Sequence, residues 1–163
     1  MKSIKPVMGA FSLMLMLVNV ANALPKEKKD ADLWLTNFAE AVNKSSAQHK
    51  LIFMSFSGSD WCKPCIKLTK EVLDSDDFKN YAKENFILLR LDFPRHKNTI
   101  SQEQVKHNEK LADKYNREGA FPLILILDSK ENVIAKTGYR PGGPQKYIEH
   151  LKSLVTKNHK NGS

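Results

Sequence analysis

Four short apolar runs mark the strands that the sequence predicts. They are five to seven residues long, rich in Leu, Ile, Val and Phe, and bounded by polar or Gly/Pro-containing segments, which is typical of buried strands. They occupy residues 51–56, 86–92, 123–127 and 133–137. Only the polar segment 128–132 separates the last two runs, which predicts an antiparallel hairpin.

Between these runs, apolar residues recur with the spacing of amphipathic helices. The first helix is expected to open at Asp30 and Asp32 and to carry Trp34 and Leu35 on its apolar face. Further helices are predicted to begin near residues 62, 77, 101 and 144, and the third of these starts with a capping box. Helices separate the first three runs, which predicts parallel crossovers and an α/β sandwich around a small mixed sheet.

The first 23 residues have the composition of a signal peptide. Lys2 and Lys5 precede an apolar stretch at residues 7–20, and Ala21-Asn22-Ala23 is a small-x-small sequence that signal peptidase accepts. A membrane anchor is the alternative, but this stretch is shorter than the about 20 residues needed to span a bilayer. We therefore expect cleavage after Ala23, no stable membrane insertion afterwards, and a periplasmic or secreted protein.

Length and charge fit one exported domain. The 163 residues suit a single domain, and we expect a lead-in at residues 24–29, the domain at residues 30–157 and a flexible tail at residues 158–163. The formal charge of +8 falls to +6 once the two leader lysines are removed. Because export separates the protein from nucleic acids, we expect no nucleic-acid partner, and we expect a monomer.

Cys62-Lys63-Pro64-Cys65 carries the chemistry, because it follows a predicted strand and opens a predicted helix. The unpaired N–H groups and the dipole at a helix N-terminus stabilise an anion, which favours the Cys62 thiolate as the nucleophile. Cys65 lies one turn further along and suits the resolving role. Lys63 adds a positive charge, and Pro64 is tolerated in the first helical turn.

Other uses of the cysteine pair are less well supported. A purely structural disulfide would constrain the unfolded chain little, because its loop is so short. Ile66 stands where a c-type haem site needs His, which excludes haem attachment. A zinc site would need two more ligands from five histidines without paired spacing, so we expect neither a metal nor a cofactor. These histidines are His49, His96, His107, His150 and His159.

The segment from Phe56 to Cys65, its strand–helix context and Phe121-Pro122 resemble the thioredoxin superfamily. The Ser-Gly-Ser-Asp-Trp-Cys lead-in most resembles the exported bacterial branch, and the likeness extends from about Leu33 to Val155. The resemblance implies a three-layer α/β/α sandwich with a central mixed sheet. It also implies that Trp61 flanks the thiol, that Pro122 is a cis proline facing the cysteines, and that Phe121 offers its backbone to an extended substrate.

The chain departs from the thioredoxin pattern in several places. Thioredoxins carry a buried acid on the strand before the motif, whereas the candidate positions here hold Ser55 and Phe56. Asp60 is the nearest acid and is expected to face solvent. Phe121 is bulkier than the usual residue before the cis proline, and Lys63-Pro64 replaces the commonest Gly-Pro pair. Arg90 stands near where thioredoxins often hold a lysine.

These observations predict an exported thiol–disulfide oxidoreductase that exchanges the Cys62–Cys65 dithiol or disulfide with protein substrates. The resemblance favours reduction or isomerisation, and a reductant in an oxidising compartment needs an electron donor, such as a membrane thiol transporter. The alternative is a non-catalytic thioredoxin-fold binding or chaperone module. The basic connection at residues 93–104 is either a contact surface for a partner or an elaborated surface loop.

Overall fold

A mixed five-stranded sheet forms the centre of the protein in the computed structural model, which describes residues 33–96 and 98–161. The strand order is β1-β3-β2-β4-β5. β3 pairs in parallel with β1 and β2, and β4 pairs antiparallel with β2 and β5. The strands are β1 (Trp34–Leu35), β2 (Leu51–Ser57), β3 (Phe86–Asp92), β4 (Leu123–Leu127) and β5 (Val133–Thr137).

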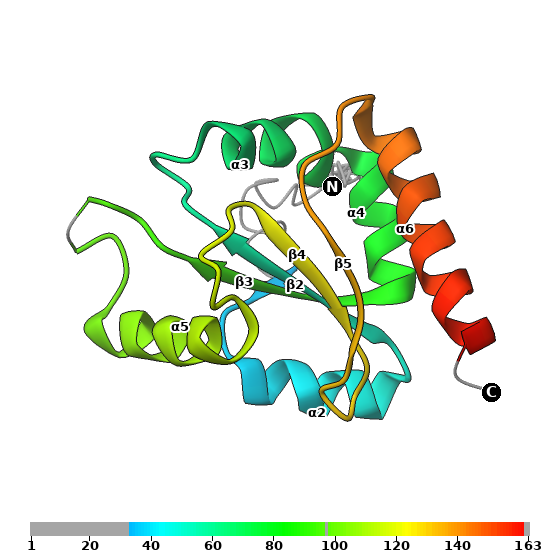
Figure 1. Ribbon diagram of the computed structural model, residues 1–163, viewed down its shortest axis with the longest axis horizontal. Coiled ribbons are helices and arrows are strands. Elements are labelled where there is room, and N and C mark those ends of the chain that lie inside the picture. The colour runs from blue at the N-terminus through cyan, green and yellow to red at the C-terminus, as the bar shows by residue number, and fades with distance from the viewer. Residues whose placement is uncertain (1–32, 97, 162–163) are drawn as a thin grey trace, which may run out of the picture.

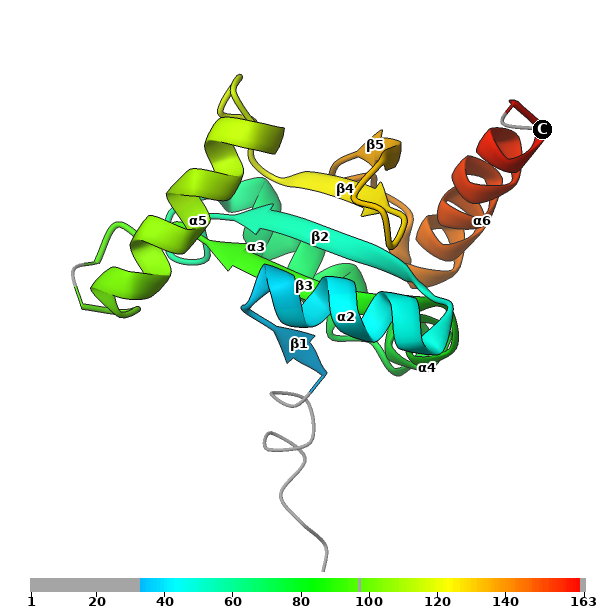
Figure 2. The same cartoon turned by 90° about the horizontal axis from the view of Figure 1, so that it is seen from below.

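Helices cover both faces of the sheet (Figures 1 and 2). α2 (Phe38–Gln48) and α5 (Gln102–Tyr115) lie on one face. The other face is covered by α3 (Lys63–Leu68), its π-helical continuation η1 (Thr69–Leu73), α4 (Asp76–Asn85) and α6 (Gly143–Asn161). The three-layer α/β/α sandwich predicted from the sequence is confirmed.

The side chains of β2 alternate between two hydrophobic cores, as the pleat of a strand requires. Phe53 belongs to the core beneath α3, α4 and α6, whereas Met54 and Phe56 belong to the core beneath α2 and α5. Both cores consist of residues that are almost fully buried. This packing holds β2 rigidly in the middle of the sheet, and its carboxyl end leads directly into the turn before the cysteines.

The structure differs from the sequence prediction at the first element. Trp34 and Leu35 form β1 and pair with Leu88 and Leu89, so the prediction that they lie in a helix is wrong. The helix begins only at Phe38, because the Asn37 side chain accepts a hydrogen bond from the Glu40 N–H and caps it. The apolar spacing that predicted one helix runs across this strand–helix junction.

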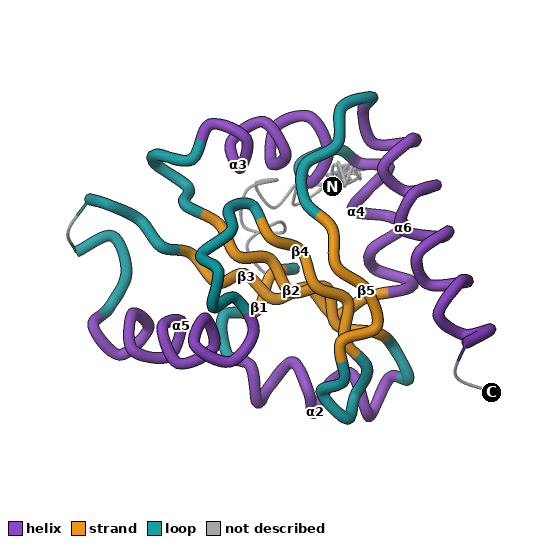
Figure 3. The backbone as a smooth tube through the Cα atoms, viewed as in Figure 1, coloured by secondary structure: helices purple, strands orange, loops and turns teal. Residues whose placement is uncertain are grey.

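The direction of β4 also differs from the prediction. β4 is antiparallel to β2, so the expected parallel crossover is wrong for this strand. Asp92 at the end of β3 lies beside Ser57, and Leu123 at the start of β4 lies beside Phe56. The chain therefore leaves the sheet and returns to it at the same end, and α5 does not carry it across. Figure 3 shows the long connections on either side of α5.

The two ends of the chain bear on the remaining sequence predictions. α6 continues to Asn161, so most of the segment predicted as a flexible tail belongs to this helix. The predicted leader, its cleavage site and the lead-in lie outside the described residues. In the part of the chain that the structure describes, no helix combines the length and apolar character needed to cross a membrane.

Candidate active site

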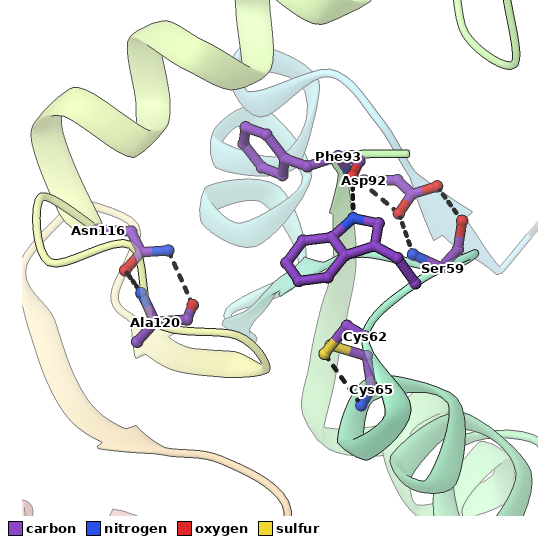
Figure 4. The surroundings of a disulfide bond; sticks show 8 residues. Ser59, Cys62, Cys65, Asp92, Phe93, Asn116 and Ala120 are labelled. Carbon is purple, nitrogen blue, oxygen red and sulfur yellow. Dashed lines mark hydrogen bonds between the residues drawn. A yellow bond between two sulfur atoms is a disulfide. The ribbon is translucent and has the colours of Figure 1, made fainter. Parts of the chain in front are cut away.

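Cys62 and Cys65 form a disulfide at the start of α3 (Figure 4). Cys62 is the N-cap of this helix, and the two Cα atoms are 5.2 Å apart. The backbone N–H of Cys65 donates to Cys62 Sγ at 3.3 Å, while the Cys62 N–H donates to the Gly58 carbonyl at 2.9 Å. A donor is thus directed at the sulfur atom that would carry negative charge after reduction, which favours a thiolate there.

Both cysteines are deeply placed in this oxidised state. Cys62 is 4% exposed and Cys65 is 2% exposed. The neighbouring surface is formed by the half-buried aromatic rings of Trp61 and Phe121, whose centroids are 5.4 Å apart. Cys62 is thus nearly as well covered as Cys65, which lies one turn further along.

Gly58 and Phe93 together fix the indole of Trp61. A Cβ atom at position 58 would lie 2.3 Å from Cε2 of the indole, so only glycine leaves room for the ring. On the other side, the indole N–H donates to the Phe93 carbonyl oxygen at 2.8 Å. The glycine of the Ser-Gly-Ser-Asp-Trp-Cys lead-in therefore leaves room for the Trp61 ring directly before Cys62.

Two carboxylates link the lead-in to the connection between β3 and α5. Asp92 accepts hydrogen bonds from the Ser59 N–H at 2.9 Å and from the Ser59 hydroxyl at 2.6 Å (Figure 4). In the opposite direction, Asp60 accepts from the Arg95 N–H at 3.0 Å and from the His96 N–H at 2.8 Å. Each segment thus supplies one acid to the other, and the two are held together reciprocally.

Asp60 does not simply face solvent, so that expectation is wrong. Its side chain is 18% exposed and also contacts the ring of His96. The backbone N–H groups of His96 and Arg95, the largest causes, lower the pKa of Asp60 to about 2. The carboxylate is therefore occupied as a cap for the Arg95–His96 backbone, which makes it poorly placed to take a proton from Cys65.

The basic connection after β3 forms one wall of the site. The guanidinium of Arg95 lies 4.4 Å from the centroid of the Trp61 ring, and the Phe93 ring lies 5.4 Å from the Phe121 ring. Sequence reasoning left this segment as a partner surface or a surface loop and did not connect it to the cysteines. Two features of the sequence were available as a signal. Phe93 is an aromatic residue directly after the strand, and the polar turn before Cys62 contains the acid Asp60.

The segment before Pro122 forms the opposite wall, and the Phe121–Pro122 peptide bond is cis, the isomer implied by the resemblance. The side-chain amide of Asn116 both donates to the Ala120 carbonyl at 3.0 Å and accepts from the Ala120 N–H at 2.9 Å (Figure 4). Gly138 also lies close, because a Cβ there would be 3.0 Å from the Pro122 carbonyl oxygen. Sequence reasoning did not identify Asn116 as a support for this segment.

The strand beneath the motif carries no acid facing α3. Ser55 lies on the same face of β2 as Phe53, toward α3, whereas Phe56 faces α2 and α5. Ser55 is buried and pairs in register with Arg90 of β3. Burial lowers the pKa of Arg90, while Asp74 and Asp92 oppose the shift, and its guanidinium lies 4.5 Å from the Trp34 ring.

The disulfide begins α3 of an α/β/α sandwich, with Cys62 as the N-cap of the helix and the held Trp61 ring beside it. These features together define a dithiol–disulfide protein of the thioredoxin class. The sequence pattern of the thioredoxin-like family matches residues 33–129. The chain belongs to this thioredoxin-like family.

Individual relatives agree with this assignment. Disulfide bond reductase DsbH of Chlamydia pneumoniae is 37% identical over 125 residues, which cover 77% of this chain and 74% of the relative. A solved structure of DsbH oxidoreductase is 35% identical, covers 76% of this chain and 83% of its own, and superposes with a TM-score of 0.70. A thioredoxin from Thermus thermophilus is 18% identical, with a TM-score of 0.59 over 80% of this chain and 92% of its own, and shares the fold. The protein is a thiol–disulfide oxidoreductase.

Proposed function

We propose that this protein is an exported reductase of protein disulfides, with Cys62 as the attacking thiol and Cys65 as the resolving thiol. The observation that carries the proposal is the position of Cys62 Sγ, which caps α3 and accepts the Cys65 N–H. A sulfur in that position is the better leaving group and the more stable thiolate of the pair. Cys65 lies inside the first turn and is bonded to Cys62 Sγ, which places it to resolve a mixed disulfide on Cys62.

The proposed exchange has two balanced steps. The Cys62 thiolate attacks one sulfur of a substrate disulfide, so a mixed disulfide forms and the other substrate sulfur leaves as a thiolate. Cys65 then loses its proton to solvent and attacks Cys62 Sγ, which releases the second substrate thiolate. The substrate gains two electrons, and the protein is left with the Cys62–Cys65 disulfide that the structure contains.

The direction of exchange is supported by the likeness to the Chlamydia pneumoniae relative, which is a disulfide bond reductase. Repeated turnover as a reductase needs a dithiol electron donor that reduces the Cys62–Cys65 disulfide. In an exported protein, a membrane thiol transporter is the class of donor that fits. The signal-peptide composition of the first 23 residues supports export, and an N-terminus at Leu24 in the purified protein would test it.

The remaining predicted site residues surround this reaction. Trp61 and Phe121 would form the surface on which a substrate segment lies, with the backbone before Pro122 available to an extended chain. Lys63 and Pro64 are exposed in the first turn of α3. Lys63 would stabilise the Cys62 thiolate through its charge, and Pro64 would leave the first turn undisturbed because an N–H there has no helical partner.

Insulin reduction by the dithiol form, followed by turbidity, tests the proposal, with Cys62→Ser and Cys65→Ser as matched variants. We expect the unmodified protein to be active and Cys62→Ser to be inactive, while Cys65→Ser accumulates mixed disulfides that resist resolution. A reduction potential of the Cys62–Cys65 couple of about −270 mV supports a reductant, whereas one of about −120 mV contradicts the proposed reductase direction. Full function without either cysteine would instead support a binding or chaperone module.

A further inference from the structure

We propose that Arg95 determines substrate specificity by favouring disulfides that have an acidic residue beside the cysteine under attack. This inference rests on the proposed function, because it assumes that Cys62 attacks a substrate disulfide. It concerns a residue of the β3–α5 connection that lies outside the cysteine motif and outside the cis-proline segment.

Both the backbone and the side chain of Arg95 are held in place. Its backbone N–H donates to both carboxylate oxygens of Asp60 at 3.0 Å, and Asp60 lies two residues before Cys62. Its guanidinium stacks 4.4 Å from the centroid of Trp61, which directly precedes Cys62. Stacking on an aromatic face leaves the N–H groups at the edge of the guanidinium free to bind a carboxylate.

The positive charge of Arg95 is available to a partner. The residue is exposed, and no carboxylate is paired with its guanidinium among residues 33–96 and 98–161. The two nearby acids are engaged elsewhere, since Asp60 caps the Arg95–His96 backbone and Asp92 binds Ser59. Lys63, immediately after Cys62, is also exposed. A substrate at Cys62 therefore meets two exposed cations, Arg95 and Lys63, whereas the Asp60 carboxylate keeps its charge but is bound by backbone N–H groups.

The path of a substrate brings its flanking residues to this charge. Trp61 directly precedes Cys62, so a substrate sulfur that bonds to Cys62 would come to lie near this residue. A residue next to that sulfur then lies over the indole, where the guanidinium is already held. A preference of about threefold corresponds to about 0.65 kcal/mol, which lies within the range for an exposed charge pair of this kind.

The test compares two peptides with one internal disulfide each, identical except for a Glu or a Lys beside the cysteines. The dithiol form of the protein is mixed with each peptide, and the rate constants are measured at low salt and in about 0.5 M salt. We expect the Glu peptide to react about threefold faster at low salt. The preference should fall clearly in Arg95→Gln, with any remainder due to Lys63, disappear in high salt, and be larger in Arg95→Lys than in Arg95→Gln.

Lys130→Gln is the matched control, because it removes the same charge from the hairpin turn at the opposite end of the sheet. This variant should keep the full preference. A neutral disulfide, bis(2-hydroxyethyl) disulfide, should react equally with the unmodified protein and Arg95→Gln. If Arg95→Gln slows both peptides and the neutral disulfide alike, Arg95 acts on the thiolate and the specificity role is wrong.

Two further results separate this inference from the proposed function. Equal rates for the Glu and Lys peptides with the unmodified protein would overturn the role of Arg95 and leave the reductase function standing. Failure to reduce any peptide or the neutral disulfide would contradict the reductase function itself, and the inference would fail with it.

Discussion

The indole N–H of Trp61 donates to the backbone carbonyl of Phe93, 2.8 Å away on a different loop. This bond joins the residue before Cys62 to the first residue after β3. With the Ser59–Asp92 and Asp60–Arg95 contacts, it makes the cysteine turn and the β3–α5 connection one unit.

Gly58→Ala is expected to displace the Trp61 ring, because the new methyl group would lie 2.3 Å from an indole carbon. The ring cannot move freely, since the Phe93 carbonyl binds it and Phe121 contacts it. We expect a loss of about 1–3 kcal/mol in the free energy of unfolding, measured by urea denaturation. The cost should shrink when Gly58→Ala is made in a Trp61→Ala background, and an unchanged cost there would contradict the steric explanation.

Asp60→Asn is expected to change the response of stability to acid. The pKa of Asp60 in the folded protein, about 2, lies below its ordinary value of 3.8. The ionised group therefore stabilises the fold fully above about pH 4, and this contribution is lost as the pH falls toward 2. Urea midpoints measured across this window should fall more steeply for the unmodified protein than for Asp60→Asn. Parallel curves would show that Asp60 makes no such contribution.

Asn116→Ala is expected to loosen the segment that carries Phe121 and Pro122. Asn116 is 6% exposed, and its side chain satisfies both the N–H and the carbonyl of Ala120. Loss of these partners should cost about 1–3 kcal/mol in unfolding free energy and slow insulin reduction. The control is Asn132→Ala, which removes an exposed side-chain hydrogen bond to Asp128 and should cost less. Similar costs for the two variants would contradict a special role for Asn116.

Lys63→Gln is expected to raise the pKa of the Cys62 thiol, because a positive charge next to the thiolate is removed. Ultraviolet absorbance of the thiolate, followed against pH in the dithiol form, measures this change in the pKa of the Cys62 thiol. Lys67→Gln removes an equal charge one turn further along α3 and should have a smaller effect. If the two variants shift the titration equally, the proximity of Lys63 to Cys62 has no special consequence.

The sequence predicted the parts of the fold that depend on neighbouring residues. The buried strands at Phe86–Asp92 and Leu123–Leu127 and the helix start at Cys62 follow from local composition and spacing. β1 could not be predicted in this way, because two residues form a strand only by pairing with Leu88 and Leu89 far along the chain. The direction of β4 likewise depends on where a long connection returns to the sheet.

The candidate site shows the same division. The cysteine pair and Pro122 could be identified from short motifs, whereas the caps supplied by Asp60 and Asn116 could not. Asp60 binds backbone groups 35 and 36 residues away, so the residues around it in the sequence do not indicate its partners. Asn116 binds only four residues ahead, but nothing in its sequence distinguishes it from the asparagine of an ordinary turn.

The reciprocal carboxylate contacts have a consequence for how this protein can vary. Surface connections usually accept insertions and changes of length with little effect on the rest of a domain. The segment after β3 differs, because the backbone of Arg95 and His96 is bound by the residue two positions before the reactive cysteine. A change in its length would displace Asp60 and Trp61 together. Homologues that differ there would thus present a different surface beside the disulfide while retaining identical cysteine motifs.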